Sequence, residues 1–499
     1  MSLSPLRLRI LHSNDIHSHF EQMPLIAEAF EELRLAMGDA PTLTLDIGDH
    51  LDRVSPITEG SEGRANLDIM TATGYDAITI GNNEGLTFPA EALNELYGSV
   101  HSSMKVLCSN LKDTATGDYP SWGAPYCIVN KGGIEIGMIG VTACYPDFYS
   151  LLGWTIEDPL PVVAELVGQL RPKVDLIVVL SHLGLKQDER MASDIQGIDL
   201  ILGGHTHHLL EQPLRIGSAM LCGAGKFGQY IGVVDIGLEP VTRKPMQMEG
   251  YVRELKRDDA EQQERQEPSP SSASLLGQRL EERIAKHRLE AGQVLDREAA
   301  WLEQAMAADS YQEAPLGNLL AQALRQFTGA DIGLVNAGQF LEGLEPGRVT
   351  LGRLLDICPS PINPSLMLLS GQQILQALEE SLLPEFTEKR IYGFGFRGKV
   401  LGMLNVDGMT VEYDPDGPAY GKIRQVRLGG CEPLRPEREY KVGSIDMFTF
   451  GTGYLSLSQS RHKEYFLPEF IRDLIRRALN DPEAILMSGN RRWIPVPHA

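Results

Sequence analysis

From Leu6 to about Tyr251 the chain alternates short runs of aliphatic and β-branched residues with longer amphipathic stretches, and this alternation constrains the fold more than any other feature. The helix-like stretches lie between the strand-like ones, so the order is typical of a layered α/β domain with buried sheets. The predicted strands lie within residues 43–49, 76–84, 105–111, 135–142, 175–184 and 199–207, and the predicted helices within residues 24–37, 62–74, 88–99 and 159–170.

The rest of the chain predicts a second domain. A length of 499 residues is too great for one core and fits two domains. We expect the first domain at residues 1–252, then a charged linker with the Pro/Ser stretch "EPSPSSAS" and a solvated helix at 253–293. Residues 294–499 should form an α+β domain with a helix at 316–329, a strand within 330–338 and further strands within 402–414.

The charge composition of the chain limits the classes of partner that it can bind. The chain has 45 Lys and Arg against 67 Asp and Glu, a net charge of -22, which opposes binding to nucleic-acid polymers. A small anionic substrate then needs local positive charge, for which metal ions are the strongest source. We see no signal peptide and no apolar run long enough to span a membrane, and the six cysteines are scattered. These features predict a cytoplasmic protein with reduced thiols.

Polar residues follow the predicted strands at the point where each strand ends. A single His or Asp there is usually a hydrogen-bonding or turn residue, but open α/β sheets gather such side chains into one site. Mixed oxygen and imidazole donors suit Zn, Mn, Co or Fe better than Mg or Ca, and so many donors fit two ions better than one. The candidate metal ligands are Asp15, His17, Asp49, Asn82, His182, His205 and His207.

Five sequence blocks, "NDIHSH", "DIGDH", "GNNE", "SHLG" and "GGHTH", resemble in order the signature of the calcineurin-like metallophosphoesterases, in the branch of the 5'-nucleotidases. The stretch "EAPLGNLLAQALRQFTGADIGLVNAG" is similar to the start of the 5'-nucleotidase C-terminal domain. The resemblance covers nearly the whole chain. It implies a four-layer α-β-β-α sandwich, an α/β fold, followed by an α+β domain that binds the substrate.

The resemblance also implies ligand roles and a reaction. Asp15, His17 and His207 would hold one divalent ion, Asn82, His182 and His205 the other, and Asp49 would bridge them. A hydroxide bridging the two ions would attack the phosphorus of a small phosphorylated metabolite, in the first instance a nucleotide. His12, His19 and His208 remain as neighbours of the site, and Asn14 as a residue that shapes the turn.

The chain departs from the family where a catalytic His and its partner Asp normally stand. Asn83 occupies the His position and Leu86 the Asp position. Asn83 can donate a hydrogen bond but cannot deliver a proton, so leaving groups of low basicity should be favoured. One alternative is therefore a cyclic-nucleotide phosphodiesterase or nucleotide-sugar pyrophosphatase. Another is a non-catalytic regulatory module that binds metal and nucleotide, which the retention of all seven donors disfavours.

The second domain departs as well. Leu341 replaces the Arg of the family's NGGGIR block, and Thr452 replaces the Asp of its GGDGY turn. An aromatic residue at these positions belongs to a core more often than to a base-stacking surface. The candidate substrate-binding residues are Asn336, Met403, Phe448 and Phe450, and the cations that could replace the lost Arg are Arg348, Arg353 and Arg397. Metal identity, base specificity and oligomeric state stay open.

Overall fold

The computed structural model describes residues 5–99, 104–256, 272–393 and 395–496, and residue contacts divide it into one unit ending at Ala291 and a second beginning at Gly292. Most of the predicted Pro/Ser linker, residues 257–271, lies outside the described residues. Helix α9 (Ser272–Leu295) follows it and is fixed to the first unit, because Arg283 and His287 bond to the Asp68 carboxylate at 2.7 and 2.9 Å. Within the described residues, no helix combines the length and apolar character needed to cross a membrane.

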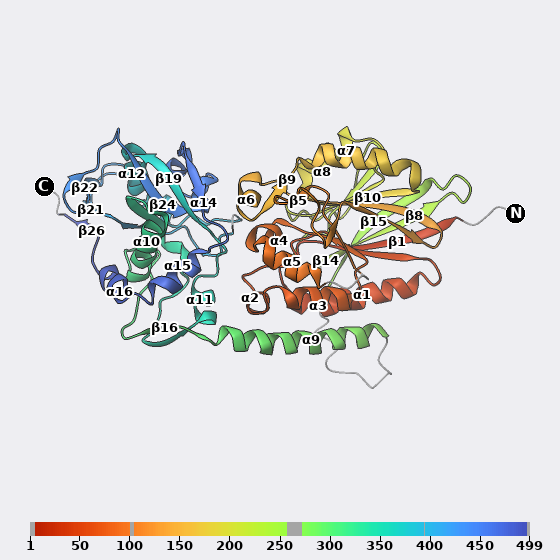
Figure 1. Cartoon of the computed structure of the whole chain (residues 1–499), viewed down its shortest axis with the longest axis horizontal. Helices are drawn as coiled ribbons and strands as arrows, with labels where there is room; N and C mark the ends of the chain where they lie inside the picture. The colour runs from red at the N-terminus through yellow and green to blue at the C-terminus, as the bar shows by residue number, and fades with distance from the viewer. Residues whose placement is uncertain (1–4, 100–103, 257–271, 394, 497–499) are drawn as a thin grey trace. The chain divides into compact units, whose positions relative to one another are not determined.

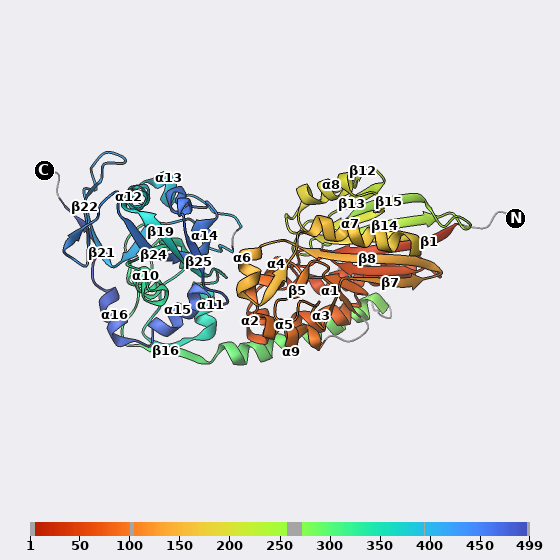
Figure 2. The ribbon, with the colours of Figure 1, turned by 45° about the horizontal axis from the view of Figure 1, so that its top comes forward.

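Two sheets form the centre of the first unit (Figures 1 and 2). The seven-stranded sheet has the order β15 (Pro245–Glu254), β14 (Tyr230–Leu238), β1 (Leu6–Ser13), β2 (Thr42–Asp46), β3 (Ala77–Thr79), β4 (Lys105–Leu107) and β6 (Gly123–Ala124). The six-stranded sheet has the order β12 (Leu214–Ile216), β13 (Ala219–Cys222), β11 (Leu200–Gly203), β10 (Leu176–His182), β8 (Ile134–Thr142) and β7 (Tyr126–Lys131). A separate short pair joins β5 (Leu111–Asp113) and β9 (Trp154–Ile156).

Helices cover the outer face of each sheet, which confirms the predicted four-layer α/β fold (Figures 1 and 2). Val178 and Leu180 of β10 pack between the sheets, whereas Ile177 and Val179 pack against the outer helices. Burial of both faces explains the continuous apolar run of β10. One outer layer contains α7 (Pro159–Leu170) and α8 (Leu185–Asp194), and the other contains α1 (Met23–Ala36), α3 (Arg64–Thr73) and α5 (Ala90–Gly98).

The strand directions bring the predicted site together. β1, β2 and β3 run parallel in one sheet, and β8, β10 and β11 run parallel in the other. Their carboxyl ends lead into the loops that carry the polar blocks, and such ends are where open α/β sheets place their sites. Three short helices flank these loops: α2 (Pro56–Ser61), α4 (Asn82–Thr87) and α6 (Pro146–Leu151).

The second unit is an α+β fold with its own core. Helix α10 (Pro315–Thr328) packs on β17, β20 and β24, and it coincides with the helix predicted at 316–329. The strands predicted within 330–338 and 402–414 are also present, as β17, β20 and β21. The larger sheet has the order β20 (Leu404–Asp407), β17 (Ile332–Asn336), β24 (Glu439–Ile445), β19 (Pro364–Ser370) and β25 (Lys463–Tyr465).

Smaller sheets and helices complete this unit. A four-stranded sheet has the order β23 (Glu432–Pro433), β22 (Ile423–Leu428), β21 (Met409–Tyr413) and β26 (Trp493–Pro495), and a pair joins β16 (Glu298–Leu302) to β18 (Gly347–Thr350). The remaining α-helices are α11 (Leu351–Ile357), α12 (Gly371–Glu380), α13 (Pro384–Thr387), α14 (Asp446–Thr449), α15 (Ile471–Ala478) and α16 (Pro482–Ser488).

Candidate metal centre

The loops that carry the candidate ligands have an unusual backbone. Left-handed conformations are uncommon for residues other than glycine, and they concentrate at functional sites because the surrounding structure must hold them. Bonds between loops do so here: the backbone N–H groups of Asp15 and His17 donate to the carbonyl oxygens of Gly48 and Asp49 at 3.0 and 2.8 Å. The ligand candidates with positive φ are Asp15 (53°), His17 (48°), Asp49 (51°), His205 (73°) and His207 (58°).

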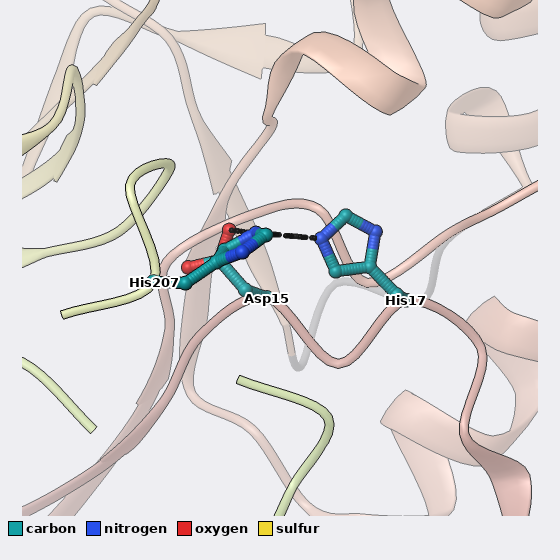
Figure 3. Close-up of side chains that lie close together, drawn as sticks. All are labelled: Asp15, His17 and His207. Atoms are coloured by element: carbon teal, nitrogen blue, oxygen red, sulfur yellow. Dashed lines mark hydrogen bonds and ion pairs between the residues drawn. The ribbon is translucent and has the colours of Figure 1, made fainter. Parts of the chain in front are cut away.

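Asp15, His17 and His207 converge into one donor cluster (Figure 3). The Nε2 atoms of His17 and His207 lie 3.1 Å apart, and the Asp15 Oδ1 atom lies 3.4 Å from His207 Nε2 and 3.9 Å from His17 Nε2. Three electron-pair donors therefore face one point. A cation bound at that point would be shared by two imidazole nitrogens and a carboxylate.

Asp49, His182 and His205 form a second cluster beside the first. The Asp49 Oδ1 atom lies 3.3 Å from His182 Nε2, whereas its Oδ2 atom lies 3.8 Å from His17 Nε2. The carboxylate thus presents one oxygen to each cluster. Asp49 is buried, and the backbone N–H of Asn83 donates to its Oδ1 atom at 2.8 Å, which fixes its orientation.

Two of the candidate ligands have a buried polar atom without a hydrogen bond within the described residues: Asn82 Oδ1, and Nε2 of His182 in the second cluster. The other ring nitrogen of His182 donates to the Ile47 carbonyl at 2.7 Å, so in the neutral ring that can bind a metal the Nε2 atom carries the lone pair. Leaving a buried acceptor unsatisfied costs about 1–3 kcal/mol. Both atoms are ordinary metal ligands, so the residues present fit a divalent cation.

Electrostatics at the centre also favour a cation. Burial alone would lower the pKa of His182, but the adjacent Asp49 carboxylate outweighs burial and raises that pKa to about 10. Burial opposes ionisation of Asp49, yet the charge of His182 holds the Asp49 pKa below its ordinary value. The negative charge of Asp49 thus attracts a proton or a metal ion. His205 differs, because burial lowers its pKa to about 4 and keeps its ring neutral.

Supporting contacts were missed by the sequence reasoning. Glu84 is buried, and its carboxylate accepts from the backbone N–H groups of Leu51, Asp49 and Gly81 at 2.8, 3.0 and 2.8 Å. Burial raises the pKa of Glu84 to about 7. This single side chain ties the loop of Asp49 to the start of α4, where Asn82 lies. Its place in the "GNNE" block was the only sequence signal that could have identified it.

Asn14 does more than shape its turn. Its Nδ2 atom donates to Asp15 Oδ2 at 2.8 Å, and its Oδ1 atom accepts from the Ala224 backbone at 2.9 Å. At the second cluster, the Tyr145 hydroxyl lies 3.2 Å from His205 Nε2. These contacts orient the cluster side chains, as outer partners of metal ligands commonly do.

The three neighbouring histidines lie outside both clusters. His12 is buried, and burial lowers its pKa to about 4. His19 Nδ1 bonds to Glu21 at 2.7 Å, and His208 Nδ1 lies 2.9 Å from the Thr206 hydroxyl. Asn83, at the position of the family's His, lies against the first cluster, with its Nδ2 atom 2.8 Å from His17 Nδ1.

The candidate substrate residues of the second unit are mostly part of its core. Asn336, Met403 and Phe448 are 1%, 5% and 0% exposed, and Asn336 Nδ2 donates to the Leu401 carbonyl at 2.6 Å. Met403 and Phe448 therefore have almost no surface available to a base in this structure. Phe450 is the exception, at 43% exposed.

The three arginines considered as replacement cations make local contacts. Arg348 and Arg353 form ion pairs with Asp296 and Glu342 at 3.3 and 2.9 Å. Arg397 donates to the carbonyl of its neighbour Phe396 at 3.3 Å. All three are thus explained by contacts within their own unit.

Comparison with known proteins agrees with this geometry. The calcineurin-like phosphoesterase family matches residues 8–209, and the 5'-nucleotidase C-terminal domain matches residues 292–459. An uncharacterized metallophosphoesterase, YunD of Bacillus subtilis (strain 168), is 37% identical over 475 residues, which cover 94% of this chain and 98% of YunD.

More distant proteins span both units. A 5'-nucleotidase of Bos taurus is 24% identical over 498 residues, covering 88% of this chain and 82% of its own. The structure of the NAD nucleotidase NadN of Haemophilus influenzae superposes with a TM-score of 0.67 over 100% of both chains at 16% identity, which shows a shared fold. The chain therefore belongs to the calcineurin-like metallophosphoesterases that carry a 5'-nucleotidase C-terminal domain, and it is a metal-dependent phosphoester hydrolase.

Proposed function

We propose that this enzyme hydrolyses phosphate esters of small metabolites, principally nucleotides, at a centre of two divalent ions. The observation that supports two ions most directly is the Asp49 carboxylate, which presents one oxygen to each donor cluster. Asp15, His17 and His207 would hold one ion and Asn82, His182 and His205 the other, and Asp49 would offer one carboxylate oxygen to each.

The donor set and the relatives support the ions and substrate class proposed. Mixed imidazole, amide and carboxylate donors favour Zn, Mn, Co or Fe. Such ions supply positive charge that polarises a phosphoryl group and lowers the pKa of a coordinated water. Nucleotides are the proposed substrates because residues 292–459 match the 5'-nucleotidase C-terminal domain and full-length relatives are named 5'-nucleotidases.

Asn83 gives a reason to consider a second substrate class. Its amide lies beside the first cluster and can donate a hydrogen bond to a phosphoryl oxygen, but an amide is not a proton source for the leaving oxygen. Leu86 offers no polar group to assist it. General acid catalysis typically raises the reaction rate by 10²- to 10⁴-fold. Without a general acid, the rate should therefore fall least for substrates whose leaving groups need no proton. Cyclic nucleotides and nucleotide sugars are the second candidates on this ground.

The test is a screen of metals against substrates. Zn²⁺, Mn²⁺, Co²⁺ and Fe²⁺ are each combined at one fixed concentration with nucleoside monophosphates, cyclic nucleotides and nucleotide sugars, and product release is measured. Asp49→Asn should abolish turnover, whereas Asp68→Asn, which alters a carboxylate of α3 outside both clusters, should retain it. If no combination of metal and substrate gives turnover although metal is bound, the proposal is refuted. That result would favour a regulatory module that binds metal and nucleotide without hydrolysis.

We further propose that the reaction takes place in the cytosol. All six cysteines are unpaired: Cys108, Cys127, Cys144, Cys222, Cys358 and Cys431. Unpaired thiols are typical of reducing compartments.

A further inference from the structure

The two ring nitrogens of His17 face different surroundings. Nε2 points into the first cluster, 3.1 Å from His207 Nε2 and 3.9 Å from Asp15 Oδ1. Nδ1 points away from it, toward Asn83 Nδ2 at 2.8 Å and Asp52 Oδ2 at 3.4 Å. Asp52 belongs to neither donor cluster, but its carboxylate lies against a proposed ligand.

The proton on His17 must be placed before Nε2 can bind a cation. A neutral imidazole carries one N–H, so an Nε2 atom that offers its lone pair to a metal requires the proton on Nδ1. That proton needs an acceptor. The Asn83 Nδ2 atom is a donor and cannot serve, whereas the Asp52 carboxylate only accepts.

Turning the Asn83 amide would place its oxygen against His17 Nδ1–H, but it would break the contact with Asn82. Asn83 Oδ1 accepts from Asn82 Nδ2 at 3.4 Å, which leaves Asn82 Oδ1 directed elsewhere as a buried acceptor without a hydrogen bond. A turned Asn83 amide would set its NH₂ group against that of Asn82. The Asp52 carboxylate, 3.4 Å from His17 Nδ1, is an acceptor for that N–H in either orientation of the Asn83 amide.

Asp52 is held firmly enough to serve as a fixed acceptor. It is 6% exposed, and its Oδ1 atom accepts from the Val54 backbone at 3.0 Å. Its own backbone N–H donates to Ser18 Oγ at 2.8 Å. Ser18 Oγ is in turn bonded by Thr58 and Asn66 at 2.7 and 3.0 Å, so the loop is braced from two helices.

We propose that Asp52 is a positioning residue that accepts the Nδ1–H of His17 and thereby fixes the tautomer and ring orientation in which His17 Nε2 binds the ion. This inference rests on the proposed ligand role of His17.

The test measures metal binding rather than turnover. Zn²⁺ binding to the full chain is titrated by calorimetry for the wild type, Asp52→Asn and the matched control Asp68→Asn, which changes the carboxylate paired with His287. Asp52→Asn should weaken one zinc site by about 10- to 100-fold, as expected for a lost outer partner of a metal ligand, and Asp68→Asn should bind as the wild type does. Wild-type affinity at both sites in Asp52→Asn would overturn the inference.

A second readout does not depend on how Asp52→Asn folds. In the zinc-loaded wild type labelled with ¹⁵N-histidine, the signals that vanish in His17→Gln identify His17, and we expect its Nδ1 to be protonated and its Nε2 to be metal-bound. The opposite tautomer would overturn the inference. If His17→Gln and Asp49→Asn both keep wild-type zinc affinity, the proposed ligand set fails. If they lose zinc while Asp52→Asn does not, only the role of Asp52 fails.

Discussion

Glu84 allows a quantitative prediction about how the metal centre is built. Its buried carboxylate accepts three backbone N–H bonds, from Asp49, Leu51 and Gly81. Glu84→Ala would leave three buried donors unsatisfied at about 1–3 kcal/mol each, or about 3–9 kcal/mol in total. The stability of a whole domain is only about 5–15 kcal/mol, so this loss should be severe.

Glu84→Gln separates the loss of an acceptor from the loss of volume. The Gln oxygen can still serve Asp49 and Gly81, but its NH₂ group would then face the Leu51 N–H. We expect a loss of about 1–3 kcal/mol, because one donor loses its acceptor. The free energy of unfolding should therefore fall in the order wild type, Glu84→Gln, Glu84→Ala.

The assay is urea unfolding of the full chain together with hydrogen exchange of the amides at residues 49, 51 and 81. These amides should exchange faster in both variants, and zinc should bind more weakly because the loop of Asp49 is no longer tied to α4. The control is Glu32→Gln, which changes an exposed carboxylate paired with Arg253 and should cost less than about 1 kcal/mol. An unfolding free energy for Glu84→Ala within about 0.5 kcal/mol of the wild type would refute the reasoning.

Three further predictions address the chemistry, the second unit and the core. Asn83→His should raise turnover of alkyl phosphates relative to aryl phosphates by up to about 10²-fold, because it adds a proton donor, and an unchanged ratio in steady-state assays would contradict this. Burial raises the pKa of Asp446 from 3.8 to about 7. Its native state then holds a proton that the unfolded chain releases, so its stabilising contribution is complete below about pH 4 and is lost as the pH rises through about 7. Asp446→Asn should reduce this loss of stability with rising pH, measured as the protection of β24 amides from hydrogen exchange. An unaltered pH dependence of that protection would contradict the prediction. Replacing Leu180, which is buried between the two sheets, by Ala should lower the free energy of unfolding in urea by about 2–5 kcal/mol. A loss below about 1 kcal/mol would argue against a tightly packed interface between the sheets.

Much of the fold could be predicted because its signals are local. The apolar run within residues 175–184 and the amphipathic stretch at 159–170 carry their own periodicity, and β10 and α7 form there. The closeness of six of the candidate ligands has a related reason. Each lies at the end of a strand or within four residues after it, and the parallel order of strands brings these ends together.

The rest depends on contacts between distant segments. Asp52 follows a candidate ligand by three positions in a loop, and nothing in that loop reveals that its carboxylate meets His17. Phe448 could have lain on a surface or in a core, and only the packing of Tyr454 and the other residues of the second unit decides that it is buried. Such placements follow from tertiary packing, which periodicity does not encode.

The left-handed backbone at Asp15, His17, Asp49, His205 and His207 has a consequence for engineering this protein. Each such residue costs about 1–2 kcal/mol relative to a conformation natural to L-amino acids, and glycine avoids most of that penalty. Directed evolution for heat resistance alone should thus enrich glycine at these five positions. The most robust descendants would be hydrolytically inert, so a thermostabilisation campaign must screen turnover in every round.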